Sequence, residues 1–162
     1  MASYISRRGL IKTFGLAAGA LVLAACGGSG ASVPQAAVAP VTLELGSKGD
    51  GLAFDKTELS AAAGAKITVK FKNNASAASG NKHNFVLVKP ADATAVAADG
   101  IAAGEASGYL KADDKRVIAH TKLLAAGESG EVTFDAPAAG AYEYMCSFPG
   151  HNVVMKGTLI IK

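Results

Sequence analysis

Three side chains able to bind a metal lie within ten residues near the end of the chain, in the segment YMCSFPGHNVVMKG (144–157). They are the thiol of Cys146, the imidazole of His151 and the thioether of Met155. The whole chain has only two Cys, three His and three Met. One Cys, two His and a weakly held Met form the copper sites of electron-transfer proteins, whereas structural zinc sites need more Cys than this chain offers. The segment therefore predicts a copper site that one further His completes.

The second His is either His83 or His120. His83 opens the run HNFVLV directly after a polar loop, and such a strand end can meet the loop that carries Cys146. His120 lies inside RVIAHTKL with no loop nearby, so we predict His83 as the ligand and His120 as a surface residue. A Pro-Gly pair between Cys146 and His151 predicts the reversal that brings these two together. Alternation along the strand places Met145 on the opposite face from Cys146, in the core.

Most of the chain after residue 40 consists of short β-rich runs, several of them alternating apolar with polar residues, separated by Gly, Pro, Asn or Asp. This pattern is typical of half-buried β-strands. The predicted strands are 41–45, 66–72, 84–88, 116–123, 131–135, 142–146 and 157–161. We therefore predict an all-β protein, an antiparallel β-sandwich of about seven strands or more. The Ala-rich stretch 91–114, interrupted by Gly, predicts a helical excursion of one or two short helices packed on the sandwich.

The charges separate the first dozen residues from the rest. Arg7, Arg8 and Lys12 lie there, and no acidic residue precedes Glu44. Without these three cations the chain has 13 basic and 13 acidic residues. A nucleic-acid-binding protein usually carries a basic patch, and no basic cluster follows residue 40. The composition thus argues against a nucleic-acid partner.

The sequence divides into three parts. Residues 1–25 combine a cationic start, a short apolar run and small residues, as export signal peptides do, and SRRGLIK resembles the twin-arginine motif. LAAC resembles the bacterial lipoprotein cleavage box, which predicts a lipid on Cys26; an uncleaved amphipathic start is the alternative. Residues 26–40 predict a flexible tether with a reach of roughly 20 Å, followed by the folded domain, 41–162. With Cys26 lipidated, Cys146 has no disulfide partner, and a metal would be its natural occupant.

Two motifs resemble one known family. CSFPGHNVVMKGTLIIK and RVIAHTKLL look very like azurin, and the chain from about residue 43 onward is similar to the azurin–auracyanin branch of the blue copper proteins, the cupredoxins. The resemblance implies a Greek-key β-sandwich with one type 1 copper ion and the following ligands: His83, Cys146 and His151 as equatorial ligands and Met155 as the axial ligand. In azurin the carbonyl just before the first His also approaches copper. The residue here is Lys82 where azurin has Gly, which marks Lys82 as a possible weak backbone contact.

The resemblance also implies a function, the transfer of single electrons between membrane redox partners as copper cycles between Cu(I) and Cu(II). It implies that Asn84 ties the two ligand loops together, and that the backbone N–H groups of Asn84 and Phe148 point at the sulfur of Cys146. Redox partners would dock transiently at an apolar patch around the edge of His151, with these candidates: Phe148, Pro149, Val153, Val154 and Leu52. The absence of Cys from 27 to 145 and the tether look more like auracyanin than azurin. We expect a monomer, exported by a bacterium and held by its lipid at the extracytoplasmic face of the membrane or in the periplasm.

Two other classes of function compete with an electron carrier. Copper enzymes that contain cupredoxin domains need further copper centres with many His, and three His cannot build these, so we expect no enzyme. The alternative is an extracytoplasmic protein that stores or delivers copper. Delivery favours exposed tracts rich in Met or His, and the chain has none.

Overall fold

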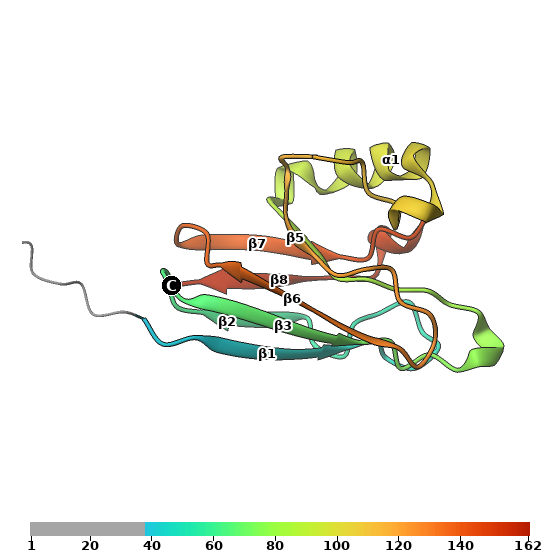
Figure 1. Ribbon diagram of the computed structural model, residues 1–162, viewed down its shortest axis with the longest axis horizontal. Helices are drawn as coiled ribbons and strands as arrows, with labels where there is room; N and C mark the ends of the chain where they lie inside the picture. Colours follow the sequence, from blue (N-terminus) through green and yellow to red (C-terminus); the bar gives the residue numbers. More distant parts are fainter. Residues whose placement is uncertain (1–37) are drawn as a thin grey trace, which may run out of the picture. The chain divides into compact units, whose positions relative to one another are not determined.

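Eight β-strands form two sheets in residues 38–162, the part of the chain that the computed structural model describes (Figure 1). Their bounds are β1 Val41–Gly46, β2 Glu58–Ala61, β3 Lys66–Lys72, β4 Val86–Val88, β5 Val117–His120, β6 Ser129–Asp135, β7 Gly140–Met145 and β8 Lys156–Ile161. One sheet has the order β1-β3-β6 and the other the order β2-β8-β7-β4-β5. The predictions for the signal peptide (1–25), for the lipid on Cys26 and for the tether up to residue 37 lie outside the described residues.

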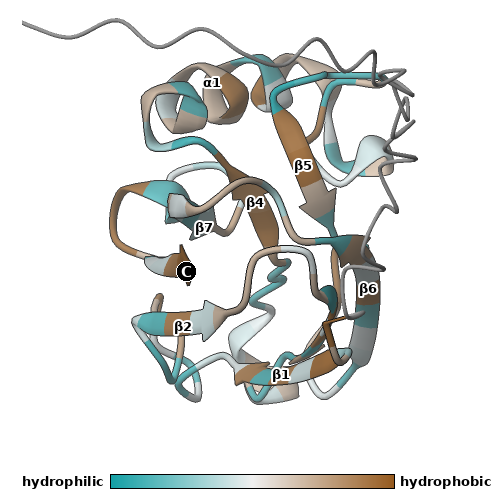
Figure 2. Ribbon diagram, turned by 90° about the vertical axis from the view of Figure 1, so that its left-hand side faces the viewer, coloured by the Kyte–Doolittle hydropathy of each residue, from teal (hydrophilic) through white to brown (hydrophobic). Residues whose placement is uncertain are grey.

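The core lies between the two sheets and follows the period of two expected for half-buried strands. In β3 the side chains of Ile67, Val69 and Phe71 are buried, and the residues between them face outward. From the other sheet Tyr144 is fully buried, and its hydroxyl donates a hydrogen bond of 2.7 Å to the backbone oxygen of Lys56. All three residues of β4 are buried, and the strand has the colour of hydrophobic residues in Figure 2. The predicted β-sandwich is confirmed.

Three features of the sheets differ from the prediction. The pairs β1–β3 and β2–β8 are parallel, so the sandwich is not purely antiparallel. The strand β2 was not predicted, because ELSA is short and has no β-branched residue to mark it. The run 116–123 forms a strand only over Val117–His120. At the next pair the N–H of Thr121 still donates to the oxygen of Phe85, but the N–H of Phe85 donates to the side-chain hydroxyl of Thr121 in place of its backbone oxygen, so the ladder ends there.

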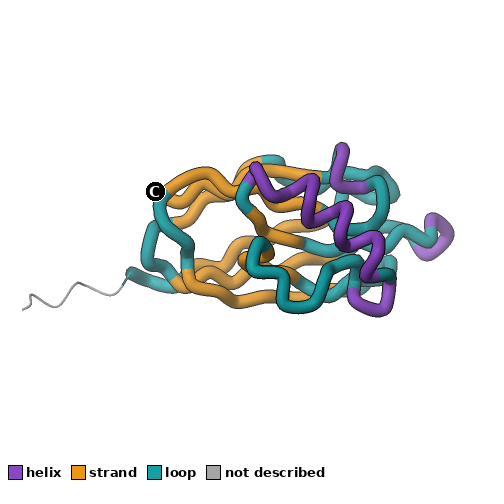
Figure 3. Tube along the Cα trace, turned by 90° about the horizontal axis from the view of Figure 1, so that it is seen from above, coloured by secondary structure: helices purple, strands orange, loops and turns teal. Residues whose placement is uncertain are grey.

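The predicted helical excursion covers the outer face of the larger sheet. It contains η2 (Pro90–Asp92), α1 (Ala93–Ala103) and η3 (Glu105–Ser107). The residues Val96 and Ala97 of α1 pack with Val86, Val88 and Met145 of β4 and β7 in a small second core, and Figure 3 shows α1 crossing the strands. Met145 is therefore a core residue, as predicted. Neither α1 nor any other helix of residues 38–162 has the length and apolar character that a membrane crossing requires.

A close backbone contact fixes the end of this excursion. Gly100 lies inside α1, and a Cβ atom at this position would lie 2.0 Å from the carbonyl oxygen of Tyr109, so only glycine fits there. Tyr109 itself has a positive φ of 56°, a conformation that costs a residue with a side chain about 1–3 kcal/mol. The backbone N–H of Tyr109 donates a hydrogen bond of 3.0 Å to the oxygen of Gly104, where α1 ends. These contacts hold Tyr109 in a strained conformation.

Candidate metal centre

His83 lies in the loop before β4 and is held by a short ladder. Its backbone N–H donates to the oxygen of Leu124 at 3.1 Å, and the N–H of Leu124 donates back to the oxygen of His83 at 2.8 Å. The fully buried Asn73 donates from its side chain to the same Leu124 oxygen at 3.0 Å. The backbone of His83 is therefore fixed on one side by residues far away in the sequence.

Cys146 and Met155 close the loop that joins β7 to β8. The strand register pairs the last residue of β7, Met145, with the first of β8, Lys156, and the next bond of this ladder runs from the N–H of Cys146 to the oxygen of Met155 at 3.1 Å. The N–H of Met155 donates to the oxygen of His151 at 2.7 Å. The hairpin thus brings all three predicted ligands of this loop together.

The turn that carries His151 needs a left-handed residue. Gly150 precedes the 3₁₀ turn η4 (His151–Val153) with a φ of 82°, which glycine adopts without steric cost. The N–H of His151 donates to the oxygen of Phe148 at 2.9 Å. The Pro-Gly pair therefore reverses the chain, and the imidazole of His151 returns toward Cys146.

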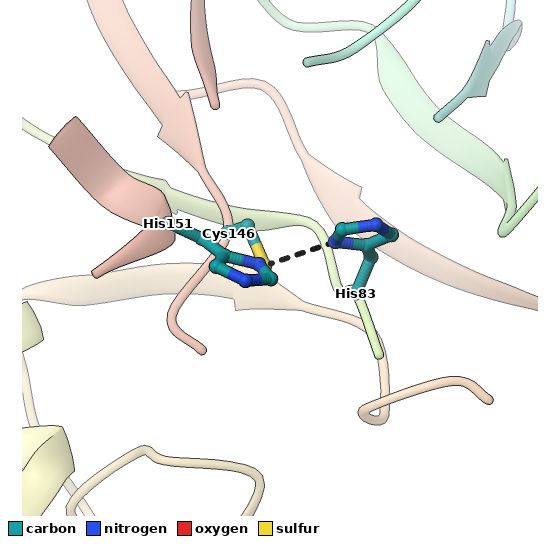
Figure 4. A group of neighbouring side chains, drawn as sticks. All are labelled: His83, Cys146 and His151. Carbon is teal, nitrogen blue, oxygen red and sulfur yellow. Dashed lines mark hydrogen bonds between the residues drawn. The ribbon is translucent and has the colours of Figure 1, made fainter. Parts of the chain in front are cut away.

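The sulfur of Cys146 lies between two imidazoles (Figure 4). The distance from its Sγ to the Nδ1 atom is 3.6 Å for His151 and 3.8 Å for His83. The ligand atoms of the three residues lie within 4.8 Å of one another, and no other such group of His, Cys and acidic residues occurs in residues 38–162. His83 and Cys146 are 0% exposed and His151 is 7% exposed. His120 lies outside this group, at the end of β5, with its Nδ1 atom 3.1 Å from the oxygen of Thr121.

Burial keeps the imidazoles and the thiol neutral when no metal is bound. Desolvation, together with the neighbouring His151, lowers the pKa of His83 from 6.5 to about 4. Desolvation also lowers the pKa of His151. Burial raises the pKa of the Cys146 thiol to about 11, although hydrogen bonds from the backbone N–H groups of Asn84 and Phe148 act in the opposite direction. A bound cation would reverse this balance, because metal ligation deprotonates a thiol.

The donor set fits a metal ion bound at the two Nδ1 atoms and the sulfur. Bonds of about 2.3 Å to sulfur and about 2.0 Å to nitrogen, at about 120° in a plane, separate the sulfur and the nitrogen by about 3.7 Å. The observed 3.6 Å and 3.8 Å match this separation. The Nε2 atom of His83 is buried and has no hydrogen-bond partner within the described region. Burying such an unpaired atom costs about 1–3 kcal/mol, so hydrogen bonding by Nε2 does not account for a buried imidazole at this position.

Asn84 links the two loops that carry the ligand atoms. Its side-chain oxygen accepts from the N–H of Ser147 at 2.9 Å, and its side-chain nitrogen donates to the hydroxyl of Ser147 at 2.8 Å. Both side chains also donate to the oxygen of Gly108, at 3.3 Å from Asn84 and 2.8 Å from Ser147. The three segments are therefore joined around one buried amide.

The remaining predicted residues surround the group. Met155 is fully buried beside Cys146. Lys82 pairs through its ammonium group with Glu105 at the surface, while its backbone leads directly into His83. Sequence reasoning missed Ser147, Gly108 and Tyr109. A Ser beside a Cys, an acceptor carbonyl and a strained backbone have no motif, and only Gly108, one of the Gly that interrupt the Ala-rich stretch, carried any signal.

Comparison with known proteins agrees with this arrangement. The family model of copper binding proteins, plastocyanin/azurin family, matches residues 41–162. Auracyanin-A of Chloroflexus aurantiacus is 48% identical over 152 residues, which cover 90% of this chain and 92% of the relative. Azurin-1 of Alcaligenes xylosoxydans xylosoxydans is 48% identical over 115 residues, covering 68% of this chain and 89% of the relative.

Solved structures give the same result. The blue copper protein auracyanin A of Chloroflexus aurantiacus has a TM-score of 0.71 at 50% identity, and the match covers 76% of this chain and 99% of that structure. Reduced auracyanin of Roseiflexus castenholzii has a TM-score of 0.71 at 39% identity, covering 77% of this chain and 99% of that structure. With its β-sandwich and its buried group of two His and one Cys, the chain belongs to the plastocyanin/azurin family of copper binding proteins.

Proposed function

We propose that His83, Cys146 and His151 bind the single type 1 copper of this blue copper electron carrier, with Met155 as a weak axial ligand. The observation that carries the proposal is the convergence of one nitrogen from each imidazole and one sulfur within 4.8 Å at three buried residues, with the Nδ1 atoms 3.6 Å and 3.8 Å from the sulfur. The bound copper supplies one-electron chemistry, since its site suits both oxidation states. A thioether is the usual weak axial donor of such sites, and Met155 is the buried Met held next to Cys146.

The protein contributes a site that changes little when the copper changes oxidation state. Backbone bonds fix Cys146 to Met155 and Met155 to His151, and the ladder to Leu124 fixes His83. Such outer contacts orient ligands and tune the metal. The N–H groups of Asn84 and Phe148 donate to the sulfur and favour its thiolate form. The carbonyl of Lys82 remains a candidate for a weak further contact, because it immediately precedes His83.

Electrons would enter and leave at the edge of His151. It is the only one of the three ligands with a measurable exposed fraction, 7%. Val153 and Val154 follow it and are 68% and 58% exposed, whereas Phe148 and Pro149 are half-buried. A small apolar surface suits short-lived contacts between redox proteins. We name Phe148, Pro149, Val153 and Val154 the apolar patch; the exposed Leu52 is a further candidate for it.

Burial also distinguishes electron transfer from the delivery or storage of copper. His83, Cys146 and Met155 are 0% exposed, so a copper acceptor could not reach three of the four proposed ligands without opening the fold. An electron needs no such opening. The proposal is likewise for a non-enzyme, because no second group of metal-ligating residues accompanies this one in residues 38–162.

For its location we propose export and a lipid anchor. The proposal rests on the sequence: the twin-arginine motif around Arg7 and Arg8, the LAAC box that ends at Cys26, and the uncharged tether that follows. A monomer that swings on such a tether would meet membrane partners while staying near the surface. Mass spectrometry of the protein purified from membranes tests this, because lipid on Cys26 adds a defined mass to its N-terminal peptide.

The test of function is optical and electrochemical. Copper-loaded domain 41–162 should be intensely blue when oxidised, lose its colour on reduction and show one reversible one-electron wave in voltammetry. Colourless copper-loaded protein, or copper that passes readily to a weak chelator, would instead support storage or delivery.

A further inference from the structure

A row of three aromatic rings leads from the segment after η3 to the metal centre. The ring of Phe148 lies beside the imidazole of His151, with 4.5 Å between centroids and an angle of 37°. The ring of Tyr109 meets Phe148 edge to face, with 5.2 Å between centroids and an angle of 73°, the favoured geometry for an aromatic pair. The ring of Tyr109 thus pairs with Phe148, and Phe148 pairs with the predicted ligand His151.

The backbone of Tyr109 is strained, and the strain is imposed from several sides. Its φ of 56° is a left-handed value at which Gly or Asn is the usual residue. The absence of a side chain at Gly100 lets α1 approach the Tyr109 carbonyl, and the N–H of Tyr109 is bonded to Gly104. Strained residues held in this way cluster at functional sites. A large aromatic residue at this position therefore requires a reason in its side chain.

The segment around Tyr109 is also attached to both ligand loops. Gly108, its neighbour, accepts hydrogen bonds from Asn84 and from Ser147. Glu105, at the start of η3, pairs with Lys82. Contacts with the loop of His83 and with the loop of Cys146 therefore hold the segment of Tyr109 in place, which gives the Tyr109 ring a defined position beside Phe148.

We propose that Tyr109 is a positioning residue that restrains the imidazole of His151 through the ring of Phe148. The inference rests on the proposed function and deepens it. It explains why the imidazole of His151 moves little when the copper changes oxidation state, and it assigns this to Tyr109, a residue outside the ligand loops. Tyr109 closes one side of Phe148, and Phe148 closes one side of His151. A fixed imidazole changes its orientation little between the two oxidation states, so electron exchange is faster.

Three substitutions separate the ring from the backbone. Tyr109→Phe keeps the edge-to-face ring and should behave as the parent. Tyr109→Ala removes the ring and keeps the strain, while Tyr109→Gly removes the ring and relieves the strain, so it folds even if the Ala variant does not. Tyr142→Ala, which removes a core ring near the start of β7, is the control for a general loss of stability.

Two readouts are measured on each variant. The first is the flip rate of the Phe148 ring, from carbon relaxation of the copper-free and the Cu(I) proteins. The second is the rate of electron self-exchange, from line broadening in mixtures of the two oxidation states. In the Ala and Gly variants Phe148 should flip roughly two- to tenfold faster, the factor that corresponds to the loss of one aromatic pair. Self-exchange should slow by a similar factor.

The outcomes divide cleanly. Faster Phe148 flips with slower self-exchange in both Ala and Gly variants, and parent values for Tyr109→Phe and Tyr142→Ala, support the proposal. Parent values of both rates in Tyr109→Gly overturn it, as does an equal change in Tyr142→Ala. The blue colour of the oxidised protein tests the ligand assignment separately. A parent protein without blue colour would contradict the proposed function, and the flip rates of the copper-free variants would still test the contact between Tyr109 and Phe148.

Discussion

The two imidazoles at the metal centre have the same chemistry and opposite surroundings. His83 is 0% exposed, and both its backbone N–H and its backbone oxygen are hydrogen-bonded to Leu124. His151 is 7% exposed and opens a single 3₁₀ turn, whose last residue, Val153, and the next residue, Val154, are exposed. The difference teaches that one imidazole anchors the metal in the fold, while the other connects it to the surface. The sulfur of Cys146 lies between the two imidazoles, 3.8 Å or less from the Nδ1 atom of each.

The largest loss of copper binding is expected from a substitution of Cys146, which lies between the two imidazoles. Cys146→Ser removes the only thiol of residues 38–162, so copper affinity should fall more than about 100-fold, beyond the usual effect of losing an outer contact. Because the blue colour needs a thiolate bound to Cu(II), it should vanish. Copper titration followed by absorption measures both. A blue Cys146→Ser protein would contradict the assignment.

The comparison is sharpened by removing each imidazole in turn. His151→Gly and His83→Gly should both lose the blue site, since each deletes one ligand. Added imidazole should restore colour faster in His151→Gly, because that position opens to solvent and the other is closed by the fold. Stopped-flow absorption measures the two rates. Equal rates, or faster recovery in His83→Gly, would break the distinction between anchor and surface connection.

The connection between the two ligand loops predicts a loss of stability. Asn84→Ala removes the amide that bonds to Ser147 and Gly108, and the buried groups left unpaired should lower the free energy of unfolding by about 2–3 kcal/mol. Urea unfolding of the copper-free protein measures it. Asn81→Ala is the matched control, because its side chain makes one bond near the surface, to the oxygen of Asp50. Equal losses in the two variants would show that Asn84 has no special role.

The buried His83 should make the stability of the copper-free protein sensitive to acid. The pKa of His83 is lowered from 6.5 to about 4, so the unfolded chain binds a proton that the folded chain refuses, and stability falls as pH falls through this window. Between pH 6.5 and about pH 5 the loss from His83 should be about 1.5 kcal/mol. Urea unfolding over this range measures it, and His83→Gln should show a flatter profile. A profile as steep in His83→Gln as in the parent would exclude His83 as the cause.

The smallest effect concerns the surface. Val153→Lys places a charge on the apolar patch of both partners in self-exchange, which should slow the reaction about tenfold at low salt and less at high salt. Val38→Lys is the control, because Val38 is 37% exposed and lies against the turn at Gly64, on the side of the sandwich where β8 ends. An equal effect of the two substitutions would move the contact surface away from His151.

The ligand motif and most strands could be predicted from the sequence, because both depend on the order of residues within one short segment. Cys146, His151 and Met155 lie in the loop of a single hairpin, and the alternation of apolar and polar residues in β3 marks the buried face of that strand. The strand β2 escaped because its stability comes from pairing with β8. Pairing between distant segments has no local signal.

The contacts behind the ligands could not be predicted. The oxygen of Gly108 and the φ of Tyr109 are properties of the backbone, which the residue type alone does not reveal. Asn84 was suggested only by resemblance to a family, because an Asn beside a loop is equally typical of a turn. Long-range packing of α1 against Tyr109 sets these contacts, so they become visible only in the fold.

A crystal structure of the copper-loaded protein is the most direct test of the ligand assignment. It should show one copper ion bonded at about 2.0–2.3 Å to the Nδ1 atoms of His83 and His151 and to the sulfur of Cys146, with Met155 more distant. Copper bonded through the Nε2 atom of either imidazole, or bound away from Cys146, would contradict it.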